Sequence, residues 1–295
     1  PSTANSLNAS NNSKSTIGQL VQGVYHSANS TTSIINVTNN TIANLNNNYE
    51  GTSTTGQVRG IYIAARGENT ITGNTVRNFS TLSANSSGNT NASIMGVLLN
   101  SNSSNGPSQT ISRNVIHSLA NNSATASVSV TGLYIFGPSY GDNTISQNFI
   151  HSLKCSSTSN SCIINGIQLT SGENFKIQNN MIRLGIDASG NSIINGYAIN
   201  GILQTGGSYT KFYHNSVYIG GTGVASSSIT AALNRSSASN YVHIVNNILV
   251  NARSNASGSA LNTAVRISNP TDYTKPYLIS NNNILFISDI NCGFV

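Results

Sequence analysis

The segment 109–123 reads QTISRNVIHSLANNS, and the segment 143–157 reads NTISQNFIHSLKCSS. The second segment repeats the first 34 residues further along the chain, with Ile, Asn, Ile, His, Ser and Leu at the same positions. Each copy places one apolar residue three positions before the Asn and another two positions after it. A pattern that recurs at a fixed interval indicates a repeat architecture, in which each copy forms one unit that stacks on the next.

The same pattern occurs eight times between residues 37 and 284, at intervals of 32 to 40 residues. A second series precedes most copies, in which a glycine is followed by apolar residues, as in GLYI at Gly132 and GIQL at Gly166. Two later copies, at Thr230 and Thr263, lack this glycine. The asparagines of the eight copies are Asn40, Asn74, Asn114, Asn148, Asn180, Asn215, Asn247 and Asn282.

Each repeat contains three short, alternating segments rich in β-branched residues, which is typical of strands and too short for helices. A solenoid in which each repeat forms one coil of three strands stacks matching strands in parallel, about 4.8 Å apart. The sequence therefore predicts an all-β, right-handed parallel β-helix of about eight coils. We expect a single domain over residues 1–295, with residues 1–19 as a polar arm or linker and residues 20–290 as the repeats.

The repeated Asn falls at the predicted bend between two strands of one coil. Asn adopts left-handed backbone geometry more readily than other residues that carry a Cβ, which suits a bend. Stacked coils also place one amide above the next, so that each can donate to its neighbour and none is left unpaired in the interior. We therefore expect a ladder of hydrogen-bonded Asn side chains along the rod.

The unit N-T-I-S-x-N-x-I-x-x-L resembles the repeats of right-handed parallel β-helix proteins, the architecture of pectate lyases and phage tailspikes. More closely, it resembles the Asn- and Ser-rich repeats of large secreted and cell-surface bacterial proteins. The resemblance extends over roughly residues 20–290 and implies the fold. It does not select a function, since the same rod carries enzymes, adhesins and structural fibres.

Polarity in this chain comes from amides and hydroxyls, because only 7% of its 295 residues are charged and 47 are Asn. The many apolar residues and only five prolines argue against disorder. The net charge of +6 is scattered, whereas nucleic-acid binding normally requires a clustered basic patch. No segment is apolar over the length of a membrane span. The composition favours an extracellular or cell-surface location, and the start at Pro1 suggests a processed chain or a fragment.

Cysteines and sequons suggest covalent modification. Cys155 and Cys162 lie close in sequence and are a candidate disulfide, while Cys292 has no evident partner. Asn-x-Ser/Thr sequons are as frequent as this composition predicts by chance, but several fall in predicted loops where a glycan can attach. These candidate glycosylation sites are Asn85, Asn91, Asn102 and Asn121.

Enzymes of the β-helix type use clustered carboxylates, so the resemblance directs attention to the seven acidic residues. Glu68, Asp142 and Glu173 recur just before a predicted strand. Glycoside chemistry needs two carboxylates that face each other across a sugar. Asp142 and Glu173 are in neighbouring coils but offset by one residue, which favours a role in tight bends. A polysaccharide lyase or glycoside hydrolase is therefore the alternative function, and no cofactor is expected.

His117 and His151 occupy the same position in adjacent coils and should stack on an outward face. Metal binding is disfavoured because no third ligand falls beside them. Contact with an anionic or sugar surface and a simple solvated face remain open. Because neighbouring strand residues point to opposite faces, Ser118 and Ser152 should not contact the histidines. The aligned positions form a polar, partly basic stripe: Arg77, His117, His151, Arg183 and Tyr218.

These observations predict a non-catalytic extracellular structural or surface protein, either an adhesin-like rod or a filament subunit. Abundant amides and hydroxyls suit many weak contacts with glycans. The segment 277–290, YLISNNNILFISDI, continues the repeat without a polar cap, which favours end-to-end self-association or continuation in a longer chain. A monomeric stalk is the alternative. The expected partners are another copy, other cell-surface components or glycans, and not nucleic acid.

Overall fold

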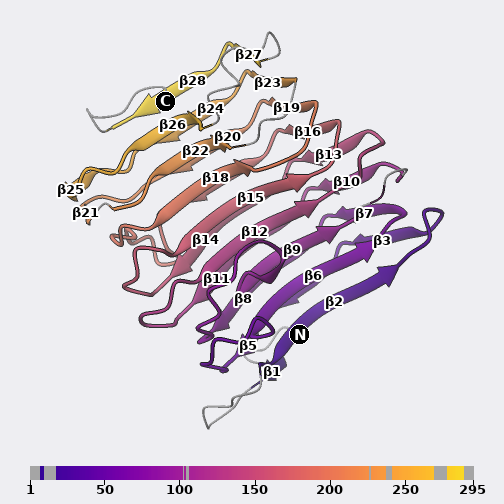
Figure 1. Ribbon diagram of the computed structural model, residues 1–295, viewed down its shortest axis with the longest axis horizontal. Helices are drawn as coiled ribbons and strands as arrows, with labels where there is room; N and C mark the ends of the chain where they lie inside the picture. The colour runs from indigo at the N-terminus through magenta and orange to yellow at the C-terminus, as the bar shows by residue number, and fades with distance from the viewer. Residues whose placement is uncertain are drawn as a thin grey trace.

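The computed structural model describes residues 7–9, 18–101, 103, 106–225, 227–236, 241–268 and 278–288. The chain forms an all-β parallel solenoid of about seven turns, which confirms the predicted fold class. Figure 1 shows the strands stacked side by side from the indigo N-terminal end to the yellow C-terminal end. The right-handed sense stays a prediction.

Three parallel sheets form the walls of the solenoid, and each coil passes through sheets B, C and A in turn. Sheet A follows the Asn bend and contains β1 (Leu7–Ala9), β4 (Thr41–Ala43), β5 (Leu45–Asn47), β8 (Thr75–Thr81), β11 (Val115–Asn121), β14 (Phe149–Cys155), β17 (Met181–Leu184), β20 (Ser216–Ile219), β24 (Ile248–Asn251) and β28 (Ile284–Ile287).

Sheet B carries the glycine series and contains β2 (Leu20–Ala28), β6 (Gln57–Ala65), β9 (Ile94–Asn100), β12 (Ser129–Phe136), β15 (Ile163–Ser171), β18 (Ala198–Gln204), β22 (Thr230–Arg235) and β26 (Asn262–Ile267). Sheet C precedes the Asn bend and contains β3 (Ile34–Thr38), β7 (Glu68–Thr72), β10 (Gln109–Ser112), β13 (Asn143–Ser146), β16 (Phe175–Gln178), β19 (Thr210–Tyr213), β23 (Val242–Val245) and β27 (Leu278–Asn281). A short ladder joins β21 (Val224–Ala225) to β25 (Asn255–Ser257), and a 3-10 helix, η1 (Asn89–Asn91), lies between β8 and β9.

The inner glycines of sheet B let it approach the apolar column of sheet A. A Cβ on Gly132 would lie 2.6 Å from Ile150 Cγ2 and 2.7 Å from the carbonyl oxygen of Gly166. Both distances are far inside van der Waals contact, so a side chain there would push the sheets apart. The two later coils that lack the glycine place Ala232 and Ala264 at this position, the smallest side chains available.

A ladder of Asn side chains links the coils at the bend between sheets C and A. Asn148 Oδ1 accepts hydrogen bonds from the backbone nitrogen and Nδ2 of Asn114, at 3.1 and 2.9 Å. Asn148 Nδ2 donates to Asn180 Oδ1 at 2.9 Å and to the Ile111 carbonyl at 3.0 Å. The buried amide is therefore fully paired. The same side-chain contact joins Asn40, Asn74, Asn114, Asn148, Asn180, Asn215 and Asn247.

The residue with left-handed backbone geometry at the bend is the one before the ladder Asn. The expectation that the repeated Asn itself adopts this geometry was therefore wrong. Gln147, for example, has a φ of 57°, and the ladder residue Asn148 is not among the residues with positive φ. The repeat therefore requires Asn for its amide and not for its backbone geometry. The left-handed position is held by residues of several types: Asn39, Gly73, Arg113, Gln147, Asn179, His214 and Asn246.

The eighth member of the ladder is Asn283, so the prediction of Asn282 was wrong. The backbone nitrogen and Nδ2 of Asn247 donate to Asn283 Oδ1 at 2.9 and 3.0 Å. Asn282 has a φ of 52° and takes the left-handed position. Three consecutive asparagines, at 281–283, let the sequence pattern fit in two registers, and the hydrogen bonds select one of them.

The same shift by one residue moves two apolar residues out of the predicted core. Ser280 pairs with Ile244, and Leu285 pairs with Leu249. Ile279 and Ile284, which the pattern places inside, are 46% and 61% exposed. The other predicted inward residues are buried, and they are Val37, Ile42, Ile71, Val76, Ile111, Ile116, Ile145, Ile150, Ile177, Ile182, Phe212, Val217, Ile244 and Leu249.

Replacing Asn148 with Ala should lower the free energy of unfolding by about 2–3 kcal/mol, because it leaves buried partners above and below without hydrogen bonds. Urea denaturation followed by circular dichroism measures the change. Asn160 is exposed, so Asn160→Ala is the matched control and should change stability by less than about 0.5 kcal/mol. Equal losses in the two variants would contradict a stabilising ladder.

Replacing Ile145 with Asp should destabilise the protein by several kcal/mol, since this side chain is 0% exposed and a carboxylate there has no cationic partner. The neighbouring Thr144 lies on the outer face of the same strand, so Thr144→Asp is the control for β13. Thermal melts of both variants test the register: equal melting temperatures would mean that Ile145 does not face the core.

Candidate functional site

Two imidazole rings stack on the outer face of sheet A. His117 pairs with His151, with ring centroids 4.7 Å apart and ring planes 4° from parallel. Arg77 pairs with His117 in the preceding coil, and Arg183 pairs with His151 in the following one. The pairing continues from Arg183 to Tyr218. These five residues form one column along the solenoid axis, here called the histidine column.

Each histidine contacts the serine that follows it, so the expectation that these serines point away was wrong. His117 Nδ1 lies 2.9 Å from Ser118 Oγ, and His151 Nδ1 lies 2.9 Å from Ser152 Oγ. Both serines have a φ of 56°, which bends strands β11 and β14 and interrupts the alternation of faces. When the hydroxyl donates to Nδ1, the hydrogen of the neutral ring lies on Nε2.

Burial and neighbouring charges favour the neutral form of both rings. Desolvation is the largest cause that lowers the pKa of His151 to about 4, followed by the charges of His117 and Arg183. Desolvation also lowers the pKa of His117, with Arg77 as the second cause. At neutral pH the histidine column therefore consists of two uncharged rings between two guanidinium groups.

The stacked rings do not suit a shared metal ion. Metal-binding nitrogens converge on one point, about 2.0–2.1 Å from each nitrogen for zinc. Parallel rings with centroids 4.7 Å apart hold their nitrogens side by side instead. Within the described ranges, no group of three or more His, Cys, Asp and Glu side chains could hold a metal ion.

A cavity of about 160 Å³ lies beside the histidine column, where β11 and β14 bend. Ser118, Ser152 and Lys154 line it from sheet A, and Asp187 and Ser189 line it from the loop that follows β17. Hydroxyl, ammonium and carboxylate groups thus face one small space. Such a set can hydrogen-bond a hydroxylated or anionic ligand, but it lacks the paired carboxylates of glycoside hydrolysis.

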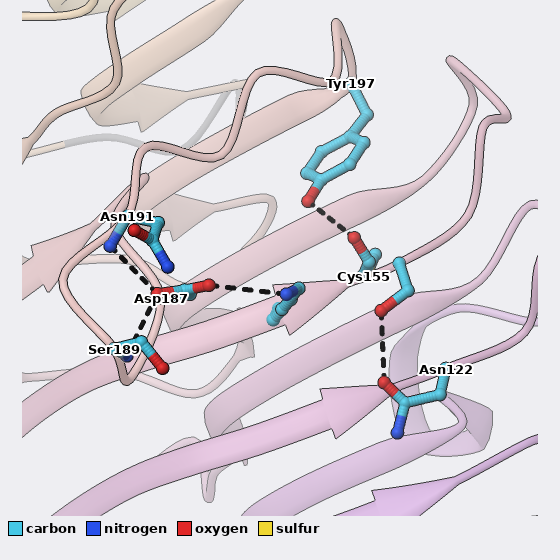
Figure 2. Close-up of polar contacts among 8 residues, drawn as sticks. Asn122, Cys155, Asp187, Ser189, Asn191 and Tyr197 are labelled. Carbon is cyan, nitrogen blue, oxygen red and sulfur yellow. Dashed lines mark hydrogen bonds and ion pairs between the residues drawn. The ribbon is translucent and has the colours of Figure 1, made fainter.

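The Asp187 loop holds its carboxylate toward the ammonium group of Lys154, and Figure 2 shows the contacts of this carboxylate with Ser189 and Asn191. Asp187 Oδ1 accepts hydrogen bonds from the backbone nitrogens of Ser189 and Asn191, at 2.9 and 3.0 Å. Asp187 Oδ2 lies 3.3 Å from Lys154 Nζ. Desolvation acts to raise the pKa of Asp187, but these hydrogen bonds and the Lys154 charge outweigh it and lower the pKa. The repeat pattern does not predict this site, because the loop departs from the repeat.

The acidic residues singled out from the sequence are spread over the edge of sheet C. Asn143 pairs with Phe175, which leaves Asp142 and Glu173 offset by one residue as expected. The Asp142 side chain is 81% exposed, and Oδ1 lies 3.8 Å from Lys176 Nζ. An exposed pair at this distance contributes little to stability.

Cys155 and Cys162 are buried free thiols in the structure, so the predicted disulfide is not formed in it and stays a prediction. The two thiols are nevertheless neighbours, since a hydrogen bond with Cys155 lowers the pKa of Cys162 to about 6. The same contact raises the pKa of Cys155. Tyr197 donates to the Cys155 carbonyl at 2.9 Å and fixes this end of β14 (Figure 2).

Two of the four predicted glycosylation sites are buried, so those two predictions were wrong. Asn85 is 0% exposed, and its Nδ2 donates to the Asn91 carbonyl at 2.8 Å. Asn121 is also 0% exposed, and its Nδ2 donates to the Ser83 carbonyl and to Ser93 Oγ. A glycan on either nitrogen is incompatible with these contacts. Asn91 is exposed and stays a prediction, and Asn102 lies outside the described residues.

None of the described segments forms a helix of the length and apolar character that a membrane crossing requires. No family model, no curated protein and no solved structure matches this chain.

Lowering the pH from about 6.5 to about 4 should destabilise the fold. The unfolded histidine binds its proton near pH 6.5, whereas folded His151 binds it near pH 4, so the stabilisation present above pH 6.5 is lost across this window. Because the ring is partly exposed, we expect a loss of about 1 kcal/mol from His151.

Urea midpoints of the wild type and of His151→Asn, measured between pH 7 and pH 4, test this expectation. The variant should show the smaller decrease. The exposed His26, replaced in the same way, controls for the substitution itself and should keep the wild-type urea midpoint at pH 7. A profile for His151→Asn that parallels the wild type would show that the ring does not titrate as described.

Protein purified without reductant in air-saturated buffer should contain a Cys155–Cys162 disulfide, because neighbouring thiols pair readily when dissolved oxygen takes up their two electrons. Alkylation in denaturant followed by peptide mass spectrometry measures it. We expect both residues to resist iodoacetamide until a reductant is added. Full alkylation of both before reduction would contradict the prediction.

Proposed function

We propose that this protein is an extracellular, non-catalytic rod that attaches to acidic polysaccharides through the histidine column. The observation that carries the proposal is the register of the column, which sets basic or hydrogen-bonding side chains in five consecutive coils on one face of the solenoid. The extracellular location and the use as an adhesin, stalk or filament subunit belong to the same proposal and rest on composition and the repeat.

The spacing of the histidine column suits an extended polysaccharide that lies along the axis. Successive coils are about 4.8 Å apart, which is close to the length of one sugar unit in an extended chain. Arg77 and Arg183 can bind carboxylate or sulfate groups in bidentate geometry. Between them, His117 and His151 offer an Nε2 hydrogen to neutral oxygens. Lys154 lies beside the column, but its charge is paired with Asp187, so the proposal rests on the two arginines.

The fold holds the side chains of the histidine column in fixed positions, so that several weak contacts can act together on one polysaccharide chain. Each column position sits on a strand that is paired with strands in the coils above and below. The buried Asn ladder fixes the bend that leads into these strands. A ligand therefore meets side chains that are already in place, which reduces the entropy cost of binding.

Binding of dextran sulfate to the immobilised protein, at fixed ionic strength, tests the proposal. The double variant Arg77→Ala/Arg183→Ala should bind at least about tenfold more weakly, a loss of about 1.4 kcal/mol. The matched control is Lys176→Ala/Lys211→Ala, which removes the same amount of charge from sheet C. At the same ionic strength it should bind within about threefold of the wild type, because salt screens charges that lie far from the ligand. Equal weakening by both doubles would mean that net charge and not the histidine column governs binding.

Acidification should strengthen the binding of dextran sulfate between about pH 6.5 and pH 4. Protonation of His117 and His151 adds positive charge to the column in this window, while sulfate groups keep their charge. The His117→Asn/His151→Asn variant should lose this pH dependence and keep its binding at pH 7 within a few-fold. If the variant keeps the pH dependence of binding, protonation of these two histidines is not its cause.

A further inference from the structure

A second cavity lies on the outer face of sheet B, away from the histidine column. It has a volume of about 380 Å³ and forms where β2, β6, β9 and β12 end and the chain bends toward sheet C. Its lining comes from four successive coils, which corresponds to a length of about 14 Å along the axis. The residues that line it are Ser27, Asn29, Ala64, Arg66, Asn100 and Phe136.

The hollow arises from a change in side-chain size along one column of the sheet. Ser27 pairs with Ala64, and Asn100 pairs with Phe136, so three short side chains are followed by an aromatic ring. Phe136 therefore closes the groove at one end. Phe136 also packs against the small apolar cluster beneath the η1 loop, which includes Leu98 and Tyr134 and holds the ring in place.

Two tyrosines stand on the same face, two residues before the groove. Tyr25 pairs with Tyr62, with ring centroids 5.1 Å apart and planes 34° from parallel. The Arg59 guanidinium carbon lies 4.7 Å from the centroid of the Tyr62 ring, and Arg59 also donates to the Thr90 carbonyl at 3.1 Å. Tyr62 is thus fixed by its neighbours, while Tyr25 is 55% exposed and offers an open aromatic surface.

The polar side of the groove carries amides, a hydroxyl and a cation. Ser27, Asn29 and Arg66 are exposed, and Arg66 forms no ion pair with any residue in the described ranges. Strands β6, β9 and β12 are paired with neighbours on both sides, whereas β2 is the terminal strand of sheet B. Over β6, β9 and β12 a ligand is therefore recognised by side chains and not by added backbone pairing.

We propose that this groove, lined by Asn29, Arg66, Asn100 and Phe136, and the neighbouring tyrosine pair Tyr25 and Tyr62 together bind a short segment of neutral saccharide chain. The apolar face of a pyranose ring packs on the exposed tyrosine surface, while the ring hydroxyls meet the amides and the guanidinium group. Concave sites that combine aromatic surface with a few placed polar groups are typical of small-ligand recognition. The groove and the histidine column belong to different sheets, so the inference is independent of the acidic polysaccharide proposed above.

Isothermal titration calorimetry with cellohexaose, xylohexaose, mannohexaose and chitohexaose tests the groove. At least one of these neutral hexasaccharides should bind the wild type. Tyr25→Ala should weaken that binding about tenfold, whereas Tyr25→Phe, which keeps the ring, should bind within about threefold of the wild type. Arg66→Ala should weaken binding to a similar extent. Tyr140→Ala, at another exposed tyrosine, is the control and should bind as the wild type does.

Two results would overturn the inference. One is the failure of every hexasaccharide to bind a folded wild-type protein. The other is binding that Tyr25→Ala and Arg66→Ala leave unchanged. Tyr25 and Arg66 are both exposed, so circular dichroism should show that the variants fold. Dextran sulfate binding, measured on the same samples, distinguishes the groove from the histidine column. The groove variants should bind dextran sulfate as the wild type does.

Discussion

The solenoid depends on a single recurring interaction, the hydrogen bond between an Asn amide of one coil and the Asn of the next. The amide is buried at the bend, where an unpaired donor or acceptor would cost about 1–3 kcal/mol. Stacking satisfies it, since each Asn accepts from the coil before and donates to the coil after. One coil alone cannot complete these bonds, so the ladder couples neighbouring coils and fixes their register.

A fixed register has consequences for the surface as well as the core. Side chains at equivalent positions form columns about 4.8 Å apart along the axis. In the core, this spacing stacks Ile, Val and Phe with almost no exposure. On the outside, it brings His117 and His151 into parallel contact and aligns the flanking arginines. The surface columns are thus by-products of the core repeat, and their chemistry can vary without loss of the fold.

Departures from the repeat mark the places where cavities form on the surface. The left-handed serines bend β11 and β14, and the loop after β17 then encloses a cavity with Lys154 and Asp187. On sheet B, Ala92 at the end of η1 packs with Met95, Leu98 and Tyr134, and Phe136 at the aromatic end of the groove packs against this cluster. The first cavity arises from bent strands and a reshaped loop, and the second from a change in side-chain size along otherwise regular strands.

The sequence by itself determined the parallel solenoid, the inward columns except in the last coil, seven of the eight ladder residues and the alignment of the histidine column. These follow from periodicity, because a buried position repeated once per coil must recur in the sequence. The tertiary structure alone decided which of three adjacent asparagines joins the ladder, since only the hydrogen bonds to Asn247 distinguish Asn283 from Asn282. It also decided the Ser–His contacts, because a local φ of 56° overrides strand alternation. The two cavities were beyond prediction for a related reason: their walls are loops and side chains of different sizes, whose positions no repeat specifies.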